Sequence, residues 1–213
     1  MTSVQAGEVE AVHNVTTENV YAQQLVEVEG QTDILTMGIP YICPYNVHSI
    51  MNPILVMCTG LGYFFNLYRG KPLVREGGVV ILTHPTTNEF HPVHHPSYID
   101  FFEEVLADTK DPHVMSQKWE QQYAEDDWYR HLYRTTNAYH GVHPFYMWYW
   151  GSHGMKHVGK VIIVGGDAAT VRKLGFTPAS TMNDAFEIAA DTVGRSPTIT
   201  HIKTPPLMIA DVK

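Results

Sequence analysis

Pro40-Tyr-Ile-Cys-Pro-Tyr-Asn46 opens a stretch that continues through Gly62-Tyr-Phe-Phe-Asn-Leu-Tyr-Arg-Gly-Lys-Pro72 to Gly77-Gly-Val-Val-Ile-Leu-Thr-His-Pro85. This order of polar, aromatic and β-branched residues indicates the end of a strand, a polar loop, a helix and a second strand. In α/β sheets, the loops that leave the carboxyl ends of the strands commonly hold the ligand. We therefore expect an α/β fold with a binding site in this stretch.

Short apolar runs alternate with helical patterns along the rest of the chain. This alternation is typical of a parallel sheet covered by helices on both faces. We expect a Rossmann-like α/β fold with a mostly parallel sheet of about four to six strands. The runs that best match buried strands are 33–37, 79–83, 161–164 and 198–202. Helices are expected at 7–24, within 49–60, and at 97–107, 116–133 and 182–193.

The helix expected at 182–193 has the clearest boundaries. Thr181 and Asp184 have the spacing of an N-terminal capping box, and Gly194 stands where a C-terminal cap belongs. No Gly/Ser-rich linker, internal repeat or shift in composition divides the sequence. We therefore expect a single domain over residues 1–213, with a helical, aromatic and histidine-rich insertion at about 108–159.

The composition argues against several classes of protein. Twenty-two acidic and fourteen basic side chains give a net charge of −8, which disfavours surfaces for nucleic acid or anionic membranes. The sequence has no run of about eighteen apolar residues, and its polar start lacks the features of a signal peptide. We therefore expect a cytoplasmic protein. Its two cysteines, Cys43 and Cys58, are expected to be buried, unpaired thiols.

Histidine is unusually frequent, with thirteen in 213 residues. Imidazole is the commonest metal ligand, so a dense group of histidines is a candidate metal site for a hydrolase or lyase. Prolines flank the segment 91–96, however, and exclude the helical spacing that makes paired histidines diagnostic. The metal site is therefore the weaker alternative, and its candidate ligands are His84, His91, His94 and His95.

Aromatic residues dominate the segment 139–150, where His140 and His143 are interleaved with tyrosine, phenylalanine and tryptophan. Clusters of this kind belong more often to a core or an interface than to a cofactor site. An exposed cluster would dock a partner chain or a second copy of this one. A stand-alone binding or assembly module that uses this surface is therefore another alternative.

The polar and basic side chains of the opening stretch are the main candidates for a binding site. Arginine grips a carboxylate at two points, and asparagine and tyrosine bind hydroxyl and carbonyl groups, which suits a small oxygenated acid. Alternatively, Arg69 and Lys71 lie on a surface turn and bind no ligand. The turn Gly165-Gly-Asp167 is expected to link a strand to a helix rather than to bind phosphate. The candidate binding residues are Tyr45, Asn46, His48, Asn52, Arg69 and Lys71.

Segments spread over nearly the whole chain are similar to one known family. They are Gly7-Glu-Val-Glu-Ala-Val-His13, Val26-Glu-Val-Glu-Gly-Gln-Thr-Asp-Ile-Leu35, Asn52, Arg75-Glu-Gly-Gly-Val-Val-Ile-Leu82, Lys160-Val-Ile-Ile-Val164, Thr181-Met-Asn-Asp-Ala-Phe-Glu-Ile-Ala189 and Thr198-Ile-Thr-His201. In this order the segments resemble the C-terminal domain of the nickel-dependent lactate racemase (LarA-like) family.

The resemblance implies an α/β lid domain that closes over a catalytic N-terminal domain, which we expect to be absent from this chain. The family inverts a 2-hydroxy acid with a nickel-pincer nucleotide tethered in that N-terminal domain. We therefore assign no catalytic residue here and expect no cofactor in this chain alone. On the helix after the first strand the family has Gln and Lys, which meet the substrate, whereas this chain has Leu55 and Cys58; this difference favours a substrate other than lactate. The implied function is the lid of a racemase or epimerase, an isomerase of an unidentified 2-hydroxy acid, inactive alone.

Overall fold

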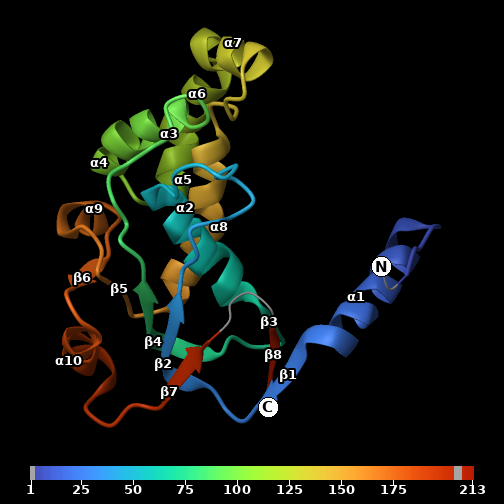
Figure 1. Ribbon diagram of the computed structural model, residues 1–213, viewed down its shortest axis with the longest axis vertical. Helices are drawn as coiled ribbons and strands as arrows, with labels where there is room; N and C mark the ends of the chain where they lie inside the picture. Colours follow the sequence, from blue (N-terminus) through green and yellow to red (C-terminus); the bar gives the residue numbers. More distant parts are fainter. Residues whose placement is uncertain (1–2, 204–207) are drawn as a thin grey trace.

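The computed structural model describes residues 3–203 and 208–213 (Figure 1). Its main sheet consists of β2 (Thr32–Gly38), β4 (Val74–Thr83), β5 (Lys160–Val164), β6 (Thr177–Ala179) and β7 (Ile199–Ile202). The strands lie in the order β6-β5-β4-β2-β7, and every pairing is parallel. The α/β fold and all four expected strands are thus confirmed. Within this sheet, the strand that the sequence did not predict is β6. It contains Pro178 and lies at an edge of the sheet, where proline is tolerated.

The expected helices are confirmed with shifted ends. The helix expected at 97–107 begins at Pro96, and the one expected at 116–133 begins earlier and is broken at Asp126. The helical segments are α1 (Val9–Gln24), α2 (Pro53–Met57), η1 (Cys58–Tyr63), η2 (Phe64–Asn66), α3 (Pro96–Asp100), η3 (Phe101–Val105), α4 (Leu106–Asp108), α5 (Pro112–Met115), η4 (Ser116–Glu120), α6 (Gln121–Glu125), α7 (Asp127–Thr135), α8 (His143–His157), α9 (Ala168–Lys173) and α10 (Met182–Val193).

Alternation along the strands divides the core between the two faces of the main sheet, because successive side chains point to opposite faces. Leu35 and Val80 belong to a large cluster that includes α2 and α8. Ile34 and Val79 belong to a smaller cluster with the alanines of α10. α10 begins as expected, because Thr181 and Asp184 form both hydrogen bonds of the capping box. Helices therefore cover both faces of the sheet.

The strand order contains one reversal of direction. From β2 the chain adds β4, β5 and β6 side by side, and β7 then returns to the opposite flank of β2. The carboxyl ends of β2 and β7 therefore meet at the switch point, where open α/β sheets form a crevice for ligands. The connection after β5 is the plain turn expected there, since the Asp167 carboxylate caps α9 by accepting the Thr170 N–H at 2.8 Å.

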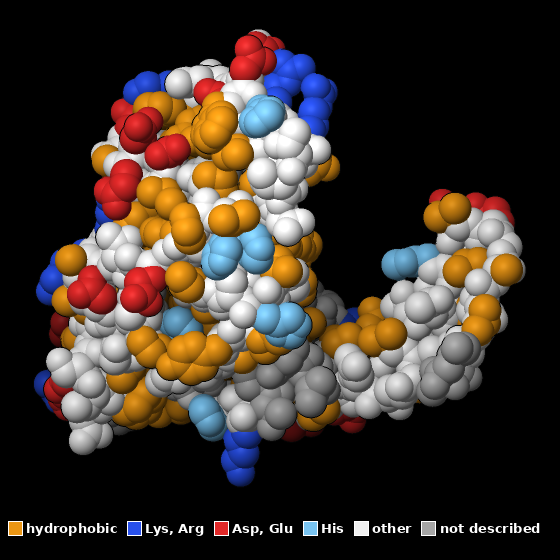
Figure 2. Space-filling model, turned by 45° about the horizontal axis from the view of Figure 1, so that its top comes forward, with side chains coloured by type: hydrophobic (Ala, Val, Ile, Leu, Met, Phe, Trp, Pro, Cys, Tyr) orange, Lys and Arg blue, Asp and Glu red, His pale blue; other side chains and the backbone are white. Residues whose placement is uncertain are grey.

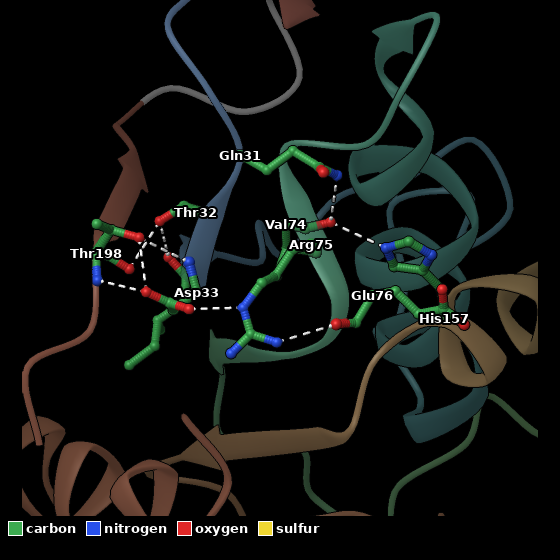
Figure 3. Close-up of polar contacts among 9 residues, drawn as sticks. Gln31, Thr32, Asp33, Val74, Arg75, Glu76, His157 and Thr198 are labelled. Carbon is green, nitrogen blue, oxygen red and sulfur yellow. Dashed lines mark hydrogen bonds and ion pairs between the residues drawn. The ribbon is translucent and has the colours of Figure 1, made fainter. Parts of the chain in front are cut away.

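The amino-terminal edge of the sheet is closed by a network of polar side chains (Figure 3). Asp33 accepts hydrogen bonds from Arg75 Nε at 2.6 Å and from both the backbone N–H and the hydroxyl of Thr198 at 2.8 Å. These contacts join the starts of β2, β4 and β7. Beside them, His157 Nε2 donates to the Val74 carbonyl at 2.9 Å. The network lowers the pKa of Asp33 to about 2, chiefly through the hydrogen bonds from Thr198 and Arg75.

Helix α8 approaches α2 and η1 closely because small residues line the contact. A Cβ atom at Gly151 would lie 2.1 Å from Met57 Sδ, and one at Gly154 would lie 3.0 Å from the Leu61 carbonyl oxygen. The aromatic segment 139–150 belongs mainly to this packed region. Phe145 and Trp148 are completely buried, whereas Tyr146 and Trp150 are 50% and 46% exposed. The expected aromatic docking surface is therefore reduced to scattered side chains.

The sequence did not indicate a second sheet, which joins β1 (Leu25–Val28), β8 (Ile209–Val212) and β3 (Tyr68–Arg69) in parallel. Helix α1 leads into it and projects from the body of the molecule (Figure 1). None of the sixteen residues of α1 is buried. Among the described residues, no helix is both long and apolar enough to cross a membrane. The division into one domain with an insertion at 108–159 stays a prediction.

Candidate functional site

A pocket of about 770 Å³ opens where the chain leaves β2, beside the switch point of the main sheet. The loop after β2 forms one wall, and η1 with η2 forms the other. Both walls come from the stretch in which the sequence predicts a binding site. The pocket is lined by Pro40, Ile42, Cys43, Pro44, Val47, His48, Thr59, Tyr63, Phe64 and Leu67.

Asn46 holds the loop wall in shape. Its buried amide group donates to the carbonyls of Tyr41 at 2.8 Å and Ser49 at 3.1 Å, and its side-chain oxygen accepts the Cys43 N–H at 3.2 Å. Val47 has a φ of 50°, a left-handed conformation that β-branched residues rarely adopt. The loop is therefore strained at its tip and pinned from beneath by one asparagine.

The second wall is built on a π-helical segment, a rare conformation that is frequent at functional sites. It brings Thr59 and Tyr63 to the same pocket. The Tyr63 hydroxyl forms a short hydrogen bond with the Tyr45 hydroxyl. Burial and this contact raise the pKa of Tyr63 above its usual range. Tyr63 therefore offers a neutral hydroxyl, not a phenolate, to a ligand.

Behind the loop, the buried His95 and the partly buried His143 contact tyrosines. His95 Nε2 donates to the Tyr45 carbonyl at 2.9 Å, and its ring stacks on Tyr139 with centroids 5.5 Å apart. His143 Nδ1 shares a 2.5 Å hydrogen bond with the Tyr98 hydroxyl. Burial lowers the pKa of both histidines to about 4. Both rings are therefore neutral near pH 7, and the bond from Nε2 leaves His95 Nδ1 as an unprotonated acceptor.

His84 stands directly after β4, the central strand of the main sheet. Its Nδ1 accepts the Thr86 N–H at 2.9 Å, so the proton of the neutral ring lies on Nε2, which has no partner. The exposed ring of Tyr41 lies over it with centroids 5.1 Å apart. Burial lowers the pKa of His84 to about 4. Beneath Tyr41, His84 thus provides a hydrogen-bond donor at the carboxyl edge.

Unpaired polar atoms and backbone strain concentrate at this edge. Among the described residues, six buried side-chain polar atoms have no partner, and five of them lie in the segments that leave β2 and β4. The three non-glycine residues with positive φ in the described chain, Val47, His48 and Thr86, lie in the same segments. Strain and unsatisfied polar groups cluster at functional sites because function requires them. The five atoms are Asn52 Nδ2, His84 Nε2, His94 Nδ1, His95 Nδ1 and Ser97 Oγ.

The structure brings together only some of the predicted binding residues. His48 lines the pocket, and Tyr45 reaches it through Tyr63. Asn46 and Asn52 lie in the same segment but are fully buried, and Asn52 caps α2 by accepting the Leu55 N–H. Both asparagines therefore shape the site from below. Whether any of the six contacts a ligand stays a prediction.

Arg69 and Lys71 lie outside the lining of the pocket. Arg69 belongs to β3 in the second sheet, pairs with the Asp211 carboxylate and lies over the Tyr21 ring at 5.2 Å. Lys71 is exposed in the turn that follows. Because the guanidinium of Arg69 is already paired with Asp211, a structural role at the surface fits this residue better than binding of a ligand carboxylate.

The four candidate metal-binding histidines do not form one ligand set. His91 and His94 stack with centroids 4.0 Å apart, whereas His84 lies against Tyr41. Within residues 3–203 and 208–213, no group of three or more His, Cys, Asp and Glu side chains is placed to hold a metal ion. Cys43 and Cys58 are free thiols as expected, although Cys43 is only partly buried.

The candidate binding residues predicted from the sequence did not include Thr59 and Tyr63 of the second wall, or the histidine–tyrosine pairs behind the loop. Thr59 and Tyr63 are four residues apart, a spacing that places two side chains on one helical face, and this signal was available. The pair of Tyr98 and His143 had no such signal, because its members are 45 positions apart.

Comparison with solved structures finds a likeness to the lactate racemase apoprotein from Thermoanaerobacterium thermosaccharolyticum, with a TM-score of 0.50 and 18% sequence identity. The alignment covers 97% of this chain and 41% of that chain, so this chain spans about two fifths of that protein's length. At this identity the likeness supports the expected resemblance at the level of the fold. No protein-family model matches the sequence, and the comparison with curated proteins gives no match.

Proposed function

We propose that this chain is the lid domain of a racemase or epimerase of the lactate racemase kind, which acts on a 2-hydroxy acid. The observation that carries this proposal is the structural likeness to lactate racemase over 97% of the chain. The sequence resemblance over the same elements supports it independently.

The chemistry of the carboxyl edge agrees with a ligand of this kind. A 2-hydroxy acid presents a hydroxyl and a carboxylate, and both groups need hydrogen-bond donors. Tyr63 and the exposed His48 line the pocket and carry groups that can donate hydrogen bonds, and the unpaired His84 Nε2 lies buried beside Tyr41 at the end of β4. Tyr63 and His84 are neutral near pH 7, because burial raises the pKa of Tyr63 and lowers that of His84 to about 4.

The proposal assigns the chemical step to a partner domain or subunit. The nickel-pincer nucleotide that the resemblance implies is assigned to this partner and not to the present chain. The role of this chain is to bind the acid from one side and to exclude water when it closes on the partner. The partner is a catalytic domain of the lactate racemase kind.

Isolation of the protein at its native length, with any polypeptide that accompanies it, tests the proposal. The preparation should convert one enantiomer of a 2-hydroxy acid into the other, as measured by chiral chromatography. Conversion should slow when the hydrogen on C2 is replaced by deuterium, since that bond breaks. Residues 1–213 alone should give no turnover. A native preparation that neither binds nor converts any 2-hydroxy acid would exclude the proposed function.

A stand-alone binding module is the second candidate, and the pocket favours it because both of its walls come from this chain. The aromatic segment 139–150 gives this candidate less support than expected, since Phe145 and Trp148 are buried. Ligand binding by residues 1–213 without turnover in the native preparation would select this candidate over the first.

A further inference from the structure

We infer that the pocket between the β2 loop and η1 holds the apolar side chain of the ligand, and that the ligand is an acid with a side chain of at least four carbons or an aromatic ring. The identity of the acid as a 2-hydroxy acid rests on the proposed function. The preference for a long apolar side chain rests on the pocket alone.

The lining of the pocket is mostly apolar. Six of the ten lining residues are proline, isoleucine, valine, phenylalanine or leucine, and none of the ten is lysine, arginine, aspartate or glutamate. A carboxylate inside such a pocket would lose its hydration without gaining a cationic partner. The carboxylate of the ligand therefore stays at the mouth, and the apolar part enters.

The mouth of the pocket exposes hydrophobic side chains that a ligand would cover. Ile42 and Val47 are 53% and 50% exposed, although both line the pocket. Figure 2 shows histidine and hydrophobic side chains together on the face that contains this edge. His48, Thr59 and Tyr63 are polar side chains of the lining. The arrangement is that of a small-molecule site, an apolar cleft with a few polar groups that fix orientation.

The volume of the pocket excludes lactate as a well-fitting ligand. A cleft of about 770 Å³ lies in the range that holds drug-sized molecules. Lactate has a single methyl group as its side chain and would leave most of the apolar lining unfilled. Because each buried methylene strengthens binding by about fourfold, the affinity for the acid should rise steeply as its side chain lengthens.

Alkylation of Cys43 provides a direct readout of pocket occupancy in the intact chain. Burial raises the pKa of both thiols, but Cys43 lines the pocket and is partly exposed, whereas Cys58 is buried with its pKa raised to about 12 and serves as the less reactive internal control. The chain has no other cysteine. Mass spectrometry would follow the rate of maleimide addition at pH 8 in the presence of lactate, 2-hydroxybutanoate, 2-hydroxyhexanoate or 3-phenyllactate.

The concentration that halves the rate of Cys43 alkylation should fall about fourfold per added methylene from lactate to 2-hydroxyhexanoate. Protection by 3-phenyllactate should be at least as strong. Equal protection by all four acids, or protection by none, would overturn the inference. Hexanoate, which lacks the hydroxyl, separates the two proposals: if it protects as well as 2-hydroxyhexanoate, the pocket assignment stands and the preference for a 2-hydroxy acid fails.

The Val47→Asn variant should fold and should bind the ligand more weakly. Asparagine tolerates the left-handed φ of 50° better than valine, so stability should be kept or raised. Loss of the apolar side chain should weaken 2-hydroxyhexanoate binding about fivefold, as measured by isothermal titration calorimetry. Val93→Asn is the matched control, because Val93 is 49% exposed and does not line the pocket. Equal losses in the two variants would overturn the inference.

Discussion

At the amino-terminal edge of the main sheet, Asp33 accepts hydrogen bonds from Arg75 and Thr198 and joins three strands (Figure 3). At the carboxyl-terminal edge, His84 and His95 are buried with one ring nitrogen each unpaired, beside a pocket of about 770 Å³. At the amino-terminal edge of the sheet the polar side chains of this network are thus hydrogen-bonded, whereas at the carboxyl-terminal edge several buried polar atoms have no partner. Substitutions at the first edge should change stability, and those at the second should change binding.

Acidification should separate the two edges most clearly. Burial lowers the pKa of His84, His95 and His143 from the usual 6.5 to about 4. Between these values the unfolded chain binds protons that the folded chain does not, so the free energy of unfolding falls as the pH falls from 6.5 to 4. Three protons correspond to at most about 4 kcal/mol per pH unit at the steepest point. Urea denaturation at half-unit intervals of pH measures this slope.

His95→Gln localises the effect of acidification. Glutamine can donate to the Tyr45 carbonyl as the imidazole does, but it does not titrate, so the slope should fall by about one third. The assignment of neutral histidines would be contradicted if the pH dependence of the free energy of unfolding were unchanged in His95→Gln. It would also be contradicted if that dependence in the wild type corresponded to the uptake of less than one proton on unfolding.

Asp33→Ala tests the amino-terminal edge. Loss of hydrogen bonds to a charged group from two neighbouring strands should lower the free energy of unfolding by about 2 kcal/mol, as measured by urea denaturation at pH 7. Because the pKa of Asp33 is lowered from 3.8 to about 2, wild-type stability should also fall between these pH values, and the variant should lack this step. Protection of Cys43 by a bound acid should be unchanged.

Glu187→Ala provides the control for Asp33→Ala. Glu187 of α10 pairs with Arg195, which follows the helix. Both side chains are largely exposed, so the pair should contribute less than 1 kcal/mol to the free energy of unfolding. If the two variants lost equal stability, the network at Asp33 would be an ordinary surface ion pair and the contrast between the edges would weaken.

Asn46→Ala should have a smaller effect on stability and a larger one on the pocket. The loop that Asn46 holds can open while the sheet remains folded, so the loss should be about 1 kcal/mol. Alkylation of Cys43 should become faster because its N–H loses a partner and the loop wall loosens. Asn19→Ala, on the exposed helix α1, should change neither quantity. Unchanged alkylation in Asn46→Ala would show that the loop does not depend on this residue.

Ser97→Ala should have the smallest effect, and its sign is the informative part. The Ser97 hydroxyl is fully buried without a partner, so its removal should leave stability unchanged or raise it by about 0.5 kcal/mol. Thr170→Val removes a buried hydroxyl that donates to Asp167 and should cost about 1 kcal/mol in the same denaturation assay. A loss at Ser97 as large as that at Thr170 would show that the carboxyl edge is as well satisfied as the rest.

The sequence predicted those features that depend on local pattern. The β-branched runs gave four strands of the main sheet, and Thr181 with Asp184 gave the start of α10. The second sheet was missed because β3 has only two residues and because β1 pairs with β8, whose residues lie 184 positions later in the sequence. Tertiary context decided these elements.

The candidate site was predicted in place but not in detail. Polar residues after a strand located the loop at 40–52, yet nothing in the sequence showed that the Asn46 side chain turns inward to hold the loop. Arg69, a candidate for binding a ligand carboxylate, pairs in the structure with Asp211, 142 positions away, and its role in binding stays a prediction. Pairings over such distances follow from the fold and not from local spacing.

The second sheet places a constraint on how the protein is made. Leu25 in β1 pairs with Ile209 in β8, so a strand near the start of the chain must await one that is synthesised 184 residues later. At about 5–20 residues per second, the ribosome needs roughly 10–40 s for that interval. Throughout it, β1 has an unpaired edge, the feature that promotes aggregation. Glu27, at the centre of this strand, provides a charge of the kind that protects such an edge during translation.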